Sequence, residues 1–316
     1  MGKTGGWART PPSPQPERER EFSFAAQSAS VTEIALALVL TSAVAHAGWN
    51  FIAKRASAGP AFNWLFDALS VLVCLPLAVV QVLVEPPRLG GVEATFVVGS
   101  ALLHLAYFLL LGQGYRVGDL SLVYPLARGV GPMLSTVAAV VLLGERPTAL
   151  ALGGAALIGL GVFVLAGDPR RLRGSAAAPS VVCALLTGVV IAAYTLWDKQ
   201  AVSAVGMPPV LYFALFTTVR AGLLTPYALA HRQLARQEWR VHRKHALGIA
   251  LLSPASYILV LYALSVSPVS YVAPVRESGI LLGAVMGSRW LAEGDTGRRL
   301  AGALAMVAGV VALALG

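Results

Sequence analysis

Residues 121–165 read SLVYPLARGVGPMLSTVAAVVLLGERPTALALGGAALIGLGVFVL, and residues 270–313 repeat this stretch in altered form as SYVAPVRESGILLGAVMGSRWLAEGDTGRRLAGALAMVAGVVAL. A single deletion in the second copy changes the offset between matched residues from 149 to 148. The matched pairs are Ser121 and Ser270, Pro125 and Pro274, Glu145 and Glu293, Gly154 and Gly302, and Gly161 and Gly309. Trp49 and Lys54 likewise correspond to Tyr194 and Lys199, 145 residues further on. Such a long constant register indicates a chain built from two duplicated halves.

The composition is typical of a membrane protein. Hydrophobic residues make up 57% of the 316 residues, charged residues only 12%, and the mean hydropathy is +0.72. A soluble domain carries about 25% charged residues, so this chain lacks the polar residues that a water-facing surface needs. Apolar runs of about 20 residues can span a bilayer as helices. We predict ten such spans, at residues 31–53, 62–84, 94–114, 119–143, 149–167, 180–198, 209–230, 246–266, 268–288 and 299–315.

The predicted spans divide the chain into two repeats. We expect a disordered polar tail at residues 1–30, a first repeat at 31–167, a basic linker at 168–179 and a second repeat at 180–316. Because five crossings end on the opposite side of the membrane from their start, the second repeat must be inverted relative to the first. The sequence therefore predicts an all-α integral membrane fold, with about ten transmembrane helices in two inverted five-helix repeats.

Charge and cysteine content bear on partners and orientation. The formal net charge is +9, but the basic residues are scattered over many short connections, so we expect no nucleic-acid partner. The side of the membrane opposite the two termini carries 14 Lys and Arg residues against 7 on the side of the termini, which favours external termini. Cys74 and Cys183 lie inside apolar segments, where we expect small buried residues and no disulfide.

A motif shared by both copies carries a family resemblance. Each copy has a proline within a span, an acidic residue at the end of that span, and a glycine-rich span after it. The first copy has Pro125, then Leu-Leu-Gly-Glu ending at Glu145, and the second has Pro274, then Leu-Ala-Glu ending at Glu293. Over residues 31–315 the chain thus resembles the EamA-like transporters of the drug/metabolite transporter superfamily. The resemblance implies export of small metabolites and cytoplasmic termini, which opposes the charge count and leaves the orientation open.

Polar residues within the predicted spans are the candidates for a functional site. A charged side chain at the bilayer centre costs about 2.5–3.5 kcal/mol, so it normally faces a cavity or a partner. His46 and His104 are alternatively hydrogen-bonded packing residues, and Arg220 can pair with an acid merely to allow insertion. The set comprises His46, Trp49 and Asn50 in the first span, Asp67 in the second, His104 in the third, Arg128 in the fourth, Arg220 in the seventh, and Arg276 and Glu277 in the ninth.

We expect a substrate cavity between the repeats, lined from the first, fourth, sixth and ninth spans. Its predicted lining comprises His46, Trp49, Asn50, Arg128, Tyr194, Trp197, Arg276 and Glu277. The candidates for proton coupling are the carboxylates of Asp67 and Glu277 and the imidazoles of His46 and His104. Pro125 and Pro274 are expected to kink matched helices, since proline removes a helical hydrogen bond.

Arg128 and Glu277 each lie three residues after the proline of their repeat, so inverted symmetry places them at equivalent depth with opposite charge. We predict that they face one another or one substrate. The alternative is that Glu277 neutralises its own neighbour, Arg276. Three intramembrane arginines against two acids slightly favour a substrate with a carboxylate, such as an amino acid. Glu145 and Glu293, at span ends, are expected to make capping or loop contacts.

A membrane-embedded enzyme is the main alternative to a transporter. The sequence contains no H-E-x-x-H, no G-x-S-x-G and no phosphate-binding Gly-Lys-Ser/Thr motif, and its Cys and His residues are not spaced as metal ligands. We therefore expect no enzymatic activity, cofactor or metal. A sensor or scaffold is also open, but neither alternative accounts for the inverted duplication. The expected setting is a multi-pass protein of the plasma (inner) membrane, whose partners are lipid, a small metabolite and protons.

Overall fold

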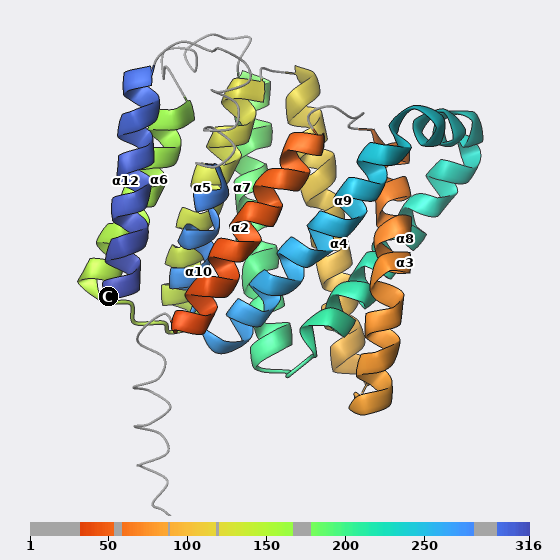
Figure 1. Ribbon diagram of the computed structural model, residues 1–316, viewed down its shortest axis with the longest axis horizontal. Coiled ribbons are helices and arrows are strands. Elements are labelled where there is room, and N and C mark those ends of the chain that lie inside the picture. The colour runs from red at the N-terminus through yellow and green to blue at the C-terminus, as the bar shows by residue number, and fades with distance from the viewer. Residues whose placement is uncertain (1–31, 54–58, 88, 118–119, 167–177, 281–295) are drawn as a thin grey trace, which may run out of the picture.

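The computed structural model describes residues 32–53, 59–87, 89–117, 120–166, 178–280 and 296–316. These residues form ten helices and no strand, which confirms the predicted all-α class (Figure 1). The predicted tail at residues 1–30 and residues 168–177 of the predicted linker lie outside the described residues. The helices are α2 (Glu33–Ala53), α3 (Pro60–Val84), α4 (Gly91–Val117), α5 (Leu120–Leu142), α6 (Ala149–Ala166), α7 (Ala178–Ser203), α8 (Pro209–Ala230), α9 (Arg232–Val266), α10 (Val269–Arg276) and α12 (Thr296–Leu315).

The helices follow the predicted spans closely. Six of them are long and apolar enough to cross a membrane: α2, α3, α4, α7, α8 and α9. Three shorter apolar helical segments, Leu126–Leu142, Ala149–Val164 and Leu300–Leu315, belong to α5, α6 and α12. The predicted ninth span begins as α10 but is described only as far as residue 280. The protein is thus a multi-pass membrane protein, and the count of ten crossings stays a prediction.

The largest difference between prediction and structure lies at the start of α9. The sequence predicts a span from residue 246 with a solvated connection before it, whereas α9 begins at Arg232. The extra residues, RQLARQEWRVHRKH, are mostly strong helix formers and include no glycine or proline, so the helix continues beyond the apolar segment. Figure 1 shows this part of α9 extending past the neighbouring end of α2.

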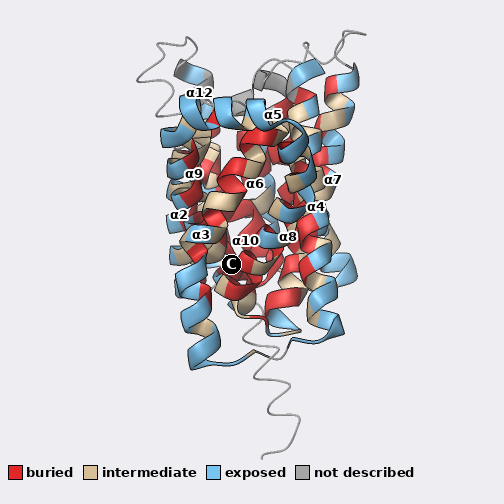
Figure 2. Cartoon of the chain, turned by 90° about the vertical axis from the view of Figure 1, so that its right-hand side faces the viewer, coloured by how far each residue is buried: buried red, intermediate tan, exposed pale blue. Residues whose placement is uncertain are grey.

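The outer surface of the bundle is apolar. Leu83 and Val84 of α3 are 77% and 79% exposed, and Val141 and Leu142 of α5 are both 72% exposed. Buried residues lie along the inner faces of the helices and exposed residues along the outer faces (Figure 2). Water would penalise so many contiguous apolar side chains, whereas lipid does not. The outer faces therefore suit the hydrocarbon core of a bilayer.

Helices α6 and α12 lie side by side at one end of the bundle (Figure 1). A Cβ atom on Gly154 would lie 2.6 Å from the backbone oxygen of Gly309, and one on Gly161 would lie 2.8 Å from that of Gly302. Both distances are too short for a side chain, so only glycine allows this approach. The glycines of these two spans thus permit close packing of α6 against α12.

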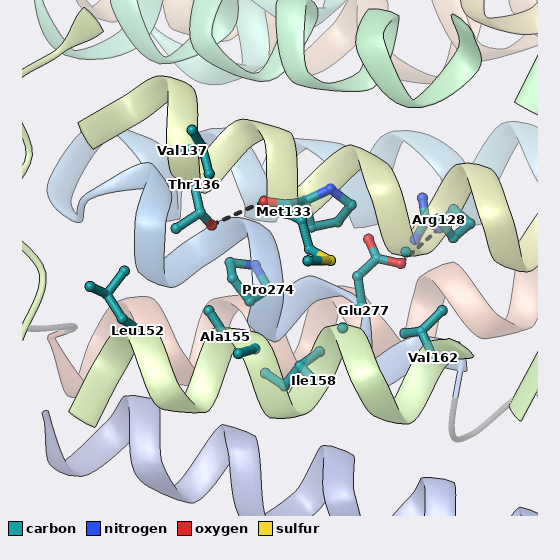
Figure 3. A pocket seen from close by; sticks show the side chains of 14 residues that line it. Arg128, Met133, Thr136, Val137, Leu152, Ala155, Ile158, Val162, Pro274 and Glu277 are labelled. Carbon is teal, nitrogen blue, oxygen red and sulfur yellow. Dashed lines mark hydrogen bonds and ion pairs between the residues drawn. The ribbon is translucent and has the colours of Figure 1, made fainter. Parts of the chain in front are cut away.

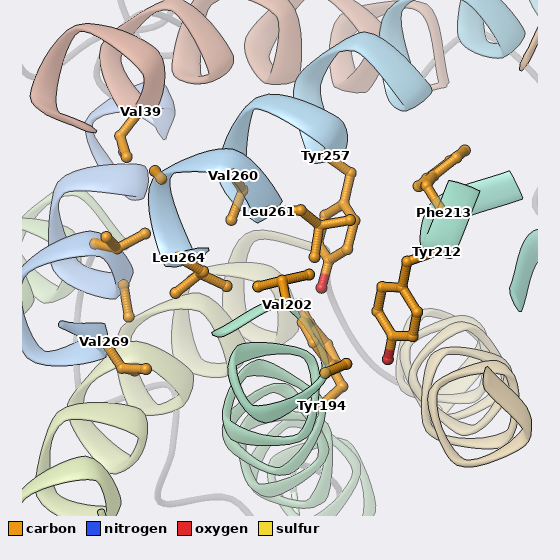
Figure 4. Packing of buried hydrophobic residues seen from close by; sticks show 14 of the residues in the cluster. Val39, Tyr194, Val202, Tyr212, Phe213, Tyr257, Val260, Leu261, Leu264 and Val269 are labelled. Carbon is orange, nitrogen blue, oxygen red and sulfur yellow. The ribbon is translucent and has the colours of Figure 1, made fainter. Parts of the chain in front are cut away.

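Buried aromatic rings occupy the centre of the bundle. Tyr194 of α7, Tyr212 of α8 and Tyr257 of α9 project toward a shared region, with Leu261 and Val202 packed beside them (Figure 4). Tyr194 and Tyr212 are 1% and 0% exposed. A buried tyrosine hydroxyl needs a hydrogen-bond partner, so these rings indicate polar groups inside an otherwise apolar core.

The loop after α5 fixes the start of α10. The two carboxylate oxygens of Glu145 accept hydrogen bonds from the backbone N–H groups of Val269 (2.7 Å) and Ser270 (2.8 Å). These N–H groups have no partner within the first turn of a helix, so the carboxylate caps α10 and complements its dipole. The predicted capping role of Glu145 is confirmed. Its counterpart Glu293 lies outside the described residues.

Candidate functional site

A cavity lies where α2, α4, α7, α8, α9 and α10 meet. We call it the central cavity. Its volume is about 40 Å³, which is room for about three water molecules at 10–15 Å³ each. Aromatic rings form most of its wall, with two arginines and two serines between them. The lining residues are His46, Trp49, His104, Tyr107, Phe108, Tyr194, Phe213, Phe216, Arg220, Ser253, Ser256, Tyr257 and Arg276.

Arg276 brings a buried positive charge to the central cavity. Its guanidinium carbon lies 5.3 Å from the ring centroid of Tyr257 and 6.0 Å from that of Tyr194. Its Nη2 donates to the Tyr194 hydroxyl at 3.5 Å. Among the described residues, no carboxylate forms an ion pair with this guanidinium. A guanidinium has five N–H donors, so the remaining donors of Arg276 can bind an anionic group in the cavity.

Asp198 of α7 is the centre of a buried hydrogen-bond network next to the cavity. Its Oδ1 accepts from Ser100 Oγ and the Tyr212 hydroxyl, both at 2.7 Å. Its Oδ2 accepts from the Tyr257 hydroxyl at 2.5 Å and lies 3.1 Å from His104 Nε2. The carboxyl is 0% exposed, and this set of donors suits its ionised form. Asp198 thus links α4, α7, α8 and α9.

His104 of α4 is held on both faces. Its ring stacks on Tyr194 at 4.2 Å between centroids and on Phe216 at 5.0 Å, and the ring of Tyr257 meets it edge-on at 5.0 Å. Together with the Asp198 contact, these rings fix the orientation of the imidazole. One edge of the ring therefore faces Asp198, and the ring also lines the central cavity.

The three residues predicted to share a face of the first span contact one another. Trp49 Nε1 donates to His46 Nδ1 at 3.2 Å, and Asn50 Nδ2 donates to the backbone oxygen of His46 at 2.8 Å. His46 and Trp49 line the central cavity, whereas Asn50 is outside its lining. The amide of Asn50 is thus used within its own helix.

Trp197 also lies outside the lining of the central cavity. Its indole Nε1 donates to the backbone oxygen of Phe96 in α4 at 2.9 Å, and its ring lies against Gly99. The contact with Gly99 is so close that a Cβ there would lie 2.5 Å from the indole. Trp197 therefore joins α7 to α4, although its sequence position beside Tyr194 suggested a cavity residue.

Asp67 of α3 pairs with Arg220 of α8. Arg220 Nε donates to Oδ2 at 2.8 Å and Nη2 donates to Oδ1 at 2.5 Å, which is a two-point contact. Both side chains are buried, at 1% and 6% exposure. Arg220 also lines the central cavity and lies 5.0 Å from the ring centroid of Phe108. Arg220 thus has an acidic partner, which agrees with the interpretation that an acid allows this arginine to insert.

Arg128 of α5 faces Glu277, the residue that follows α10. Arg128 Nε lies 2.9 Å from Glu277 Oε2, and both side chains are 3% exposed. The predicted contact between these residues is therefore present, and the alternative pairing of Glu277 with Arg276 is not among the ion pairs of the described residues. Of these two residues adjacent in sequence, Glu277 thus forms an ion pair with Arg128 and Arg276 forms none with a described carboxylate.

A second cavity, which we call the side pocket, adjoins this ion pair. It lies between α5, α6 and α10 and has a volume of about 160 Å³ (Figure 3). Apart from Arg128, Thr136 and Glu277 its lining is apolar, and several lining residues face outward. Met133 and Val137, for example, are 44% and 60% exposed. The side pocket therefore opens toward the lipid-facing surface.

The two matched prolines lie within helices, Pro125 in α5 and Pro274 in α10. Helix α10 ends at Arg276, two residues after Pro274, and the backbone N–H of Glu277 donates to the oxygen of Pro274 at 3.0 Å. This contact spans three residues instead of four, as expected where a helix tightens or ends. The predicted kinks remain predictions, and the side chain of Pro125 is outside the described residues.

Of the predicted cavity lining, His46, Trp49, Tyr194 and Arg276 line the central cavity. His104, predicted only as a candidate for proton coupling, lines it as well, and sequence reasoning missed Asp198. The predicted sixth span ends at this residue, and Asp198 was not among the polar residues singled out within the spans. Its spacing carried a signal, because Asp198 follows Tyr194 by four residues and so shares its helix face. Among the described residues, no group of three His, Cys, Asp or Glu side chains could hold a metal ion.

Comparison with known proteins gives a family match for part of the chain and a fold for most of it. Residues 178–315 match the model of the EamA-like transporter family. No curated protein matches the chain. Among solved structures 29 chains match, including one crystal structure with a TM-score of 0.67 and 18% identity, which covers 89% of this chain and 96% of its own. At this identity the structural match shows the fold alone, and it extends over both halves.

Proposed function

We propose, from the match of residues 178–315 to the EamA-like transporter family, that this chain is a secondary transporter exporting a small carboxylate-bearing metabolite. Members of the family are generally transporters of small molecules. The single observation that carries the substrate class is Arg276. It is a buried guanidinium in an aromatic cavity, and no described carboxylate pairs with it. An amino acid, whose carboxylate would bind Arg276, is the substrate that we propose to test first.

Contacts between the helices support inverted repeats. Gly154 contacts Gly309, and Gly161 contacts Gly302. In the sequence Gly154 corresponds to Gly302 and Gly161 to Gly309. Exchanging the two halves therefore turns one contact into the other, as a two-fold axis between α6 and α12 requires.

The pairing of other helices follows the same rule. If the halves correspond in order, α2 matches α7, α3 matches α8, and α4 matches α9. Exchanging the halves then turns the pair of α4 and α7 into the pair of α9 and α2. The two helices of each pair are in contact, as this exchange requires. Helices α3 and α8, which would exchange with one another, also pack together. This symmetry supports alternating access, in which the two halves open the central cavity to opposite sides in turn.

The small central cavity fits a closed state. At about 40 Å³ it holds a few water molecules, not an amino acid. Substrate would enter only after the surrounding helices move apart. The sequence carries no nucleotide-binding motif, so the energy would come from an ion or solute gradient across the plasma (inner) membrane.

Transport by purified protein is the direct test. Proteoliposomes are loaded with an equimolar mixture of the twenty amino acids, and efflux is followed by mass spectrometry. We expect at least one amino acid to leave faster than from protein-free liposomes, and Arg276→Gln to remove the difference. Equal efflux from both kinds of liposome for every amino acid would contradict the proposed substrate class. Chemical conversion of any of them would favour the membrane-enzyme alternative.

A further inference from the structure

The buried carboxylates of the bundle differ in what neutralises them. Asp67 faces Arg220 and Glu277 faces Arg128. A guanidinium keeps its proton at any physiological pH, so each of these two acids has a permanent countercharge. Asp198 forms no ion pair with an arginine or lysine among the described residues. Its one titratable basic partner is His104.

The geometry defines the protonation pattern of His104. An ionised carboxylate can only accept hydrogen bonds, so His104 Nε2 must carry the hydrogen that points to Asp198 Oδ2. In the neutral imidazole, Nδ1 then carries a lone pair. Nδ1 forms no hydrogen bond with the described residues, and the ring lines the central cavity. The ring that carries this basic nitrogen thus lines the cavity, and a buried carboxylate lies at its Nε2 edge.

We propose that His104 and Asp198 form the proton-binding site of this transporter, with the transferred proton held on His104 Nδ1. The proposal rests on the transport function proposed above. A proton from the cavity adds to the Nδ1 lone pair, while the Nε2–H bond to Asp198 stays in place. The carboxylate of Asp198, which accepts a hydrogen bond from neutral His104, thereby forms a buried ion pair with the protonated ring. On release the proton returns from Nδ1 to the cavity, and His104 keeps its Nε2–H tautomer.

Charged and titratable groups surround this site on every side. Asp198 attracts the imidazolium, whereas Arg220 and Arg276 repel it, and Asp67 offsets Arg220. Asp198 is a positioning residue, because it acts on the proton only through the His104 ring. The groups around the cavity are His46 on α2, Asp67 on α3, Tyr107 on α4, Tyr194 and Asp198 on α7, Tyr212 and Arg220 on α8, Tyr257 on α9 and Arg276 on α10.

The site is linked to Arg276 through two shared rings. His104 stacks on Tyr194 and meets Tyr257, and Arg276 donates to the Tyr194 hydroxyl and lies over Tyr257. Protonation of His104 adds a positive charge to the cavity that contains Arg276. A bound carboxylate should therefore strengthen proton binding, and by reciprocity the proton should strengthen carboxylate binding. This linkage would couple substrate movement to the proton gradient.

The first test needs no substrate. The chain has five histidines, so selective ¹⁵N labelling of histidine gives a readable NMR spectrum of the protein in nanodiscs. We expect the signal that His104→Gln removes to report an Nε2–H tautomer at neutral pH and to gain a second proton as the pH is lowered. Asp198→Asn should remove this tautomer preference. A His104 signal that stays neutral down to pH 5, or an Nδ1–H tautomer, would overturn the proposal.

The second test separates coupling from transport. Proteoliposomes carry the amino-acid mixture inside, and the pH gradient is imposed or collapsed. We expect the gradient to change wild-type efflux by about tenfold, a typical coupling between linked sites. His104→Gln and Asp198→Asn should remove the response of efflux to the gradient, and Tyr257→Phe should respond in part. His242→Gln, outside the central cavity, is the matched control and should respond as the wild type does.

The outcomes distinguish the two proposals. If wild-type efflux is present but ignores the pH gradient, the proton site is wrong and the transport function stands. If no amino acid moves, the proposed substrate class fails, and the NMR titration alone decides whether His104 binds the proton. If either variant is not monodisperse in detergent, Tyr257→Phe supplies the flux comparison, since it removes only the hydroxyl that donates to Asp198.

Discussion

Arg276 and Glu277 are neighbours in the chain but belong to two different cavities. Arg276 lines the central cavity among aromatic rings, without a carboxylate partner among the described residues, whereas Glu277 lines the side pocket and pairs with Arg128. The larger volume belongs to the side pocket, at about 160 Å³ against about 40 Å³. Volume alone would therefore select the side pocket, whereas we propose the central cavity for the substrate. A charge that the protein has already neutralised contributes to stability, and one that it has not neutralised is available to a ligand.

The largest effect is expected from the ion pair at the side pocket. Glu277→Ala leaves the Arg128 guanidinium without its partner, which should cost about 3–5 kcal/mol of unfolding free energy. The double variant with Arg128→Ala should be more stable than the sum of the single effects predicts. Reversible unfolding in mixed micelles measures both. Additive losses would mean that the two charges are not coupled and that the contrast between the cavities is wrong.

The second largest effect is expected when Arg276 is replaced, and it is a loss of substrate binding. Replacing it with Gln removes the charge that would hold a substrate carboxylate, so apparent affinity in efflux assays should fall about 100-fold, or about 2.8 kcal/mol. Unfolding free energy should change much less than for Glu277→Ala. Arg276→Lys should recover part of the affinity, since it keeps the charge but not the planar fork. Unchanged affinity in Arg276→Gln would remove Arg276 from substrate binding.

A smaller loss of stability is expected at Gly154, where α6 packs tightly against α12. Gly154→Ala places a Cβ against the backbone of α12, and overpacking of this kind costs about 1–3 kcal/mol. Gly153→Ala is the matched control, because a Cβ there meets nothing within 4 Å. Thermal unfolding in detergent should show a loss for Gly154→Ala alone. Equal stability of the two variants would contradict the contact between α6 and α12.

The smallest effect is expected at Trp197. Trp197→Phe removes the hydrogen bond to the backbone oxygen of Phe96, which should cost about 0.5–1.5 kcal/mol of unfolding free energy. Efflux corrected for expression should stay at the wild-type rate, because the residue lies outside the lining of the central cavity. A loss of substrate affinity would instead restore the cavity role predicted from the sequence.

The sequence predicts most of the fold because insertion into lipid leaves few choices. Apolar runs in lipid must become helices, so the spans follow from composition alone. The predicted start of α9 was wrong because polar helix formers extend the helix beyond its apolar segment. The matched prolines placed Arg128 opposite Glu277. Asp198 and the pairing of Asp67 with Arg220 could not be found in this way. These contacts join α7 to α4 and α3 to α8, and they depend on helix rotation and tilt, which packing sets.

The accessibility of the two cavities tests the central claim most directly. In a background without Cys74 and Cys183, Trp49→Cys reports on the central cavity and Met133→Cys on the side pocket. A charged, water-soluble thiol reagent should label the first position, and an amino acid that is transported should protect it. The second position should stay unlabelled, since Met133 faces lipid. Labelling of Met133→Cys that the same amino acid blocks, with no labelling of Trp49→Cys, would place the substrate in the side pocket and contradict this account.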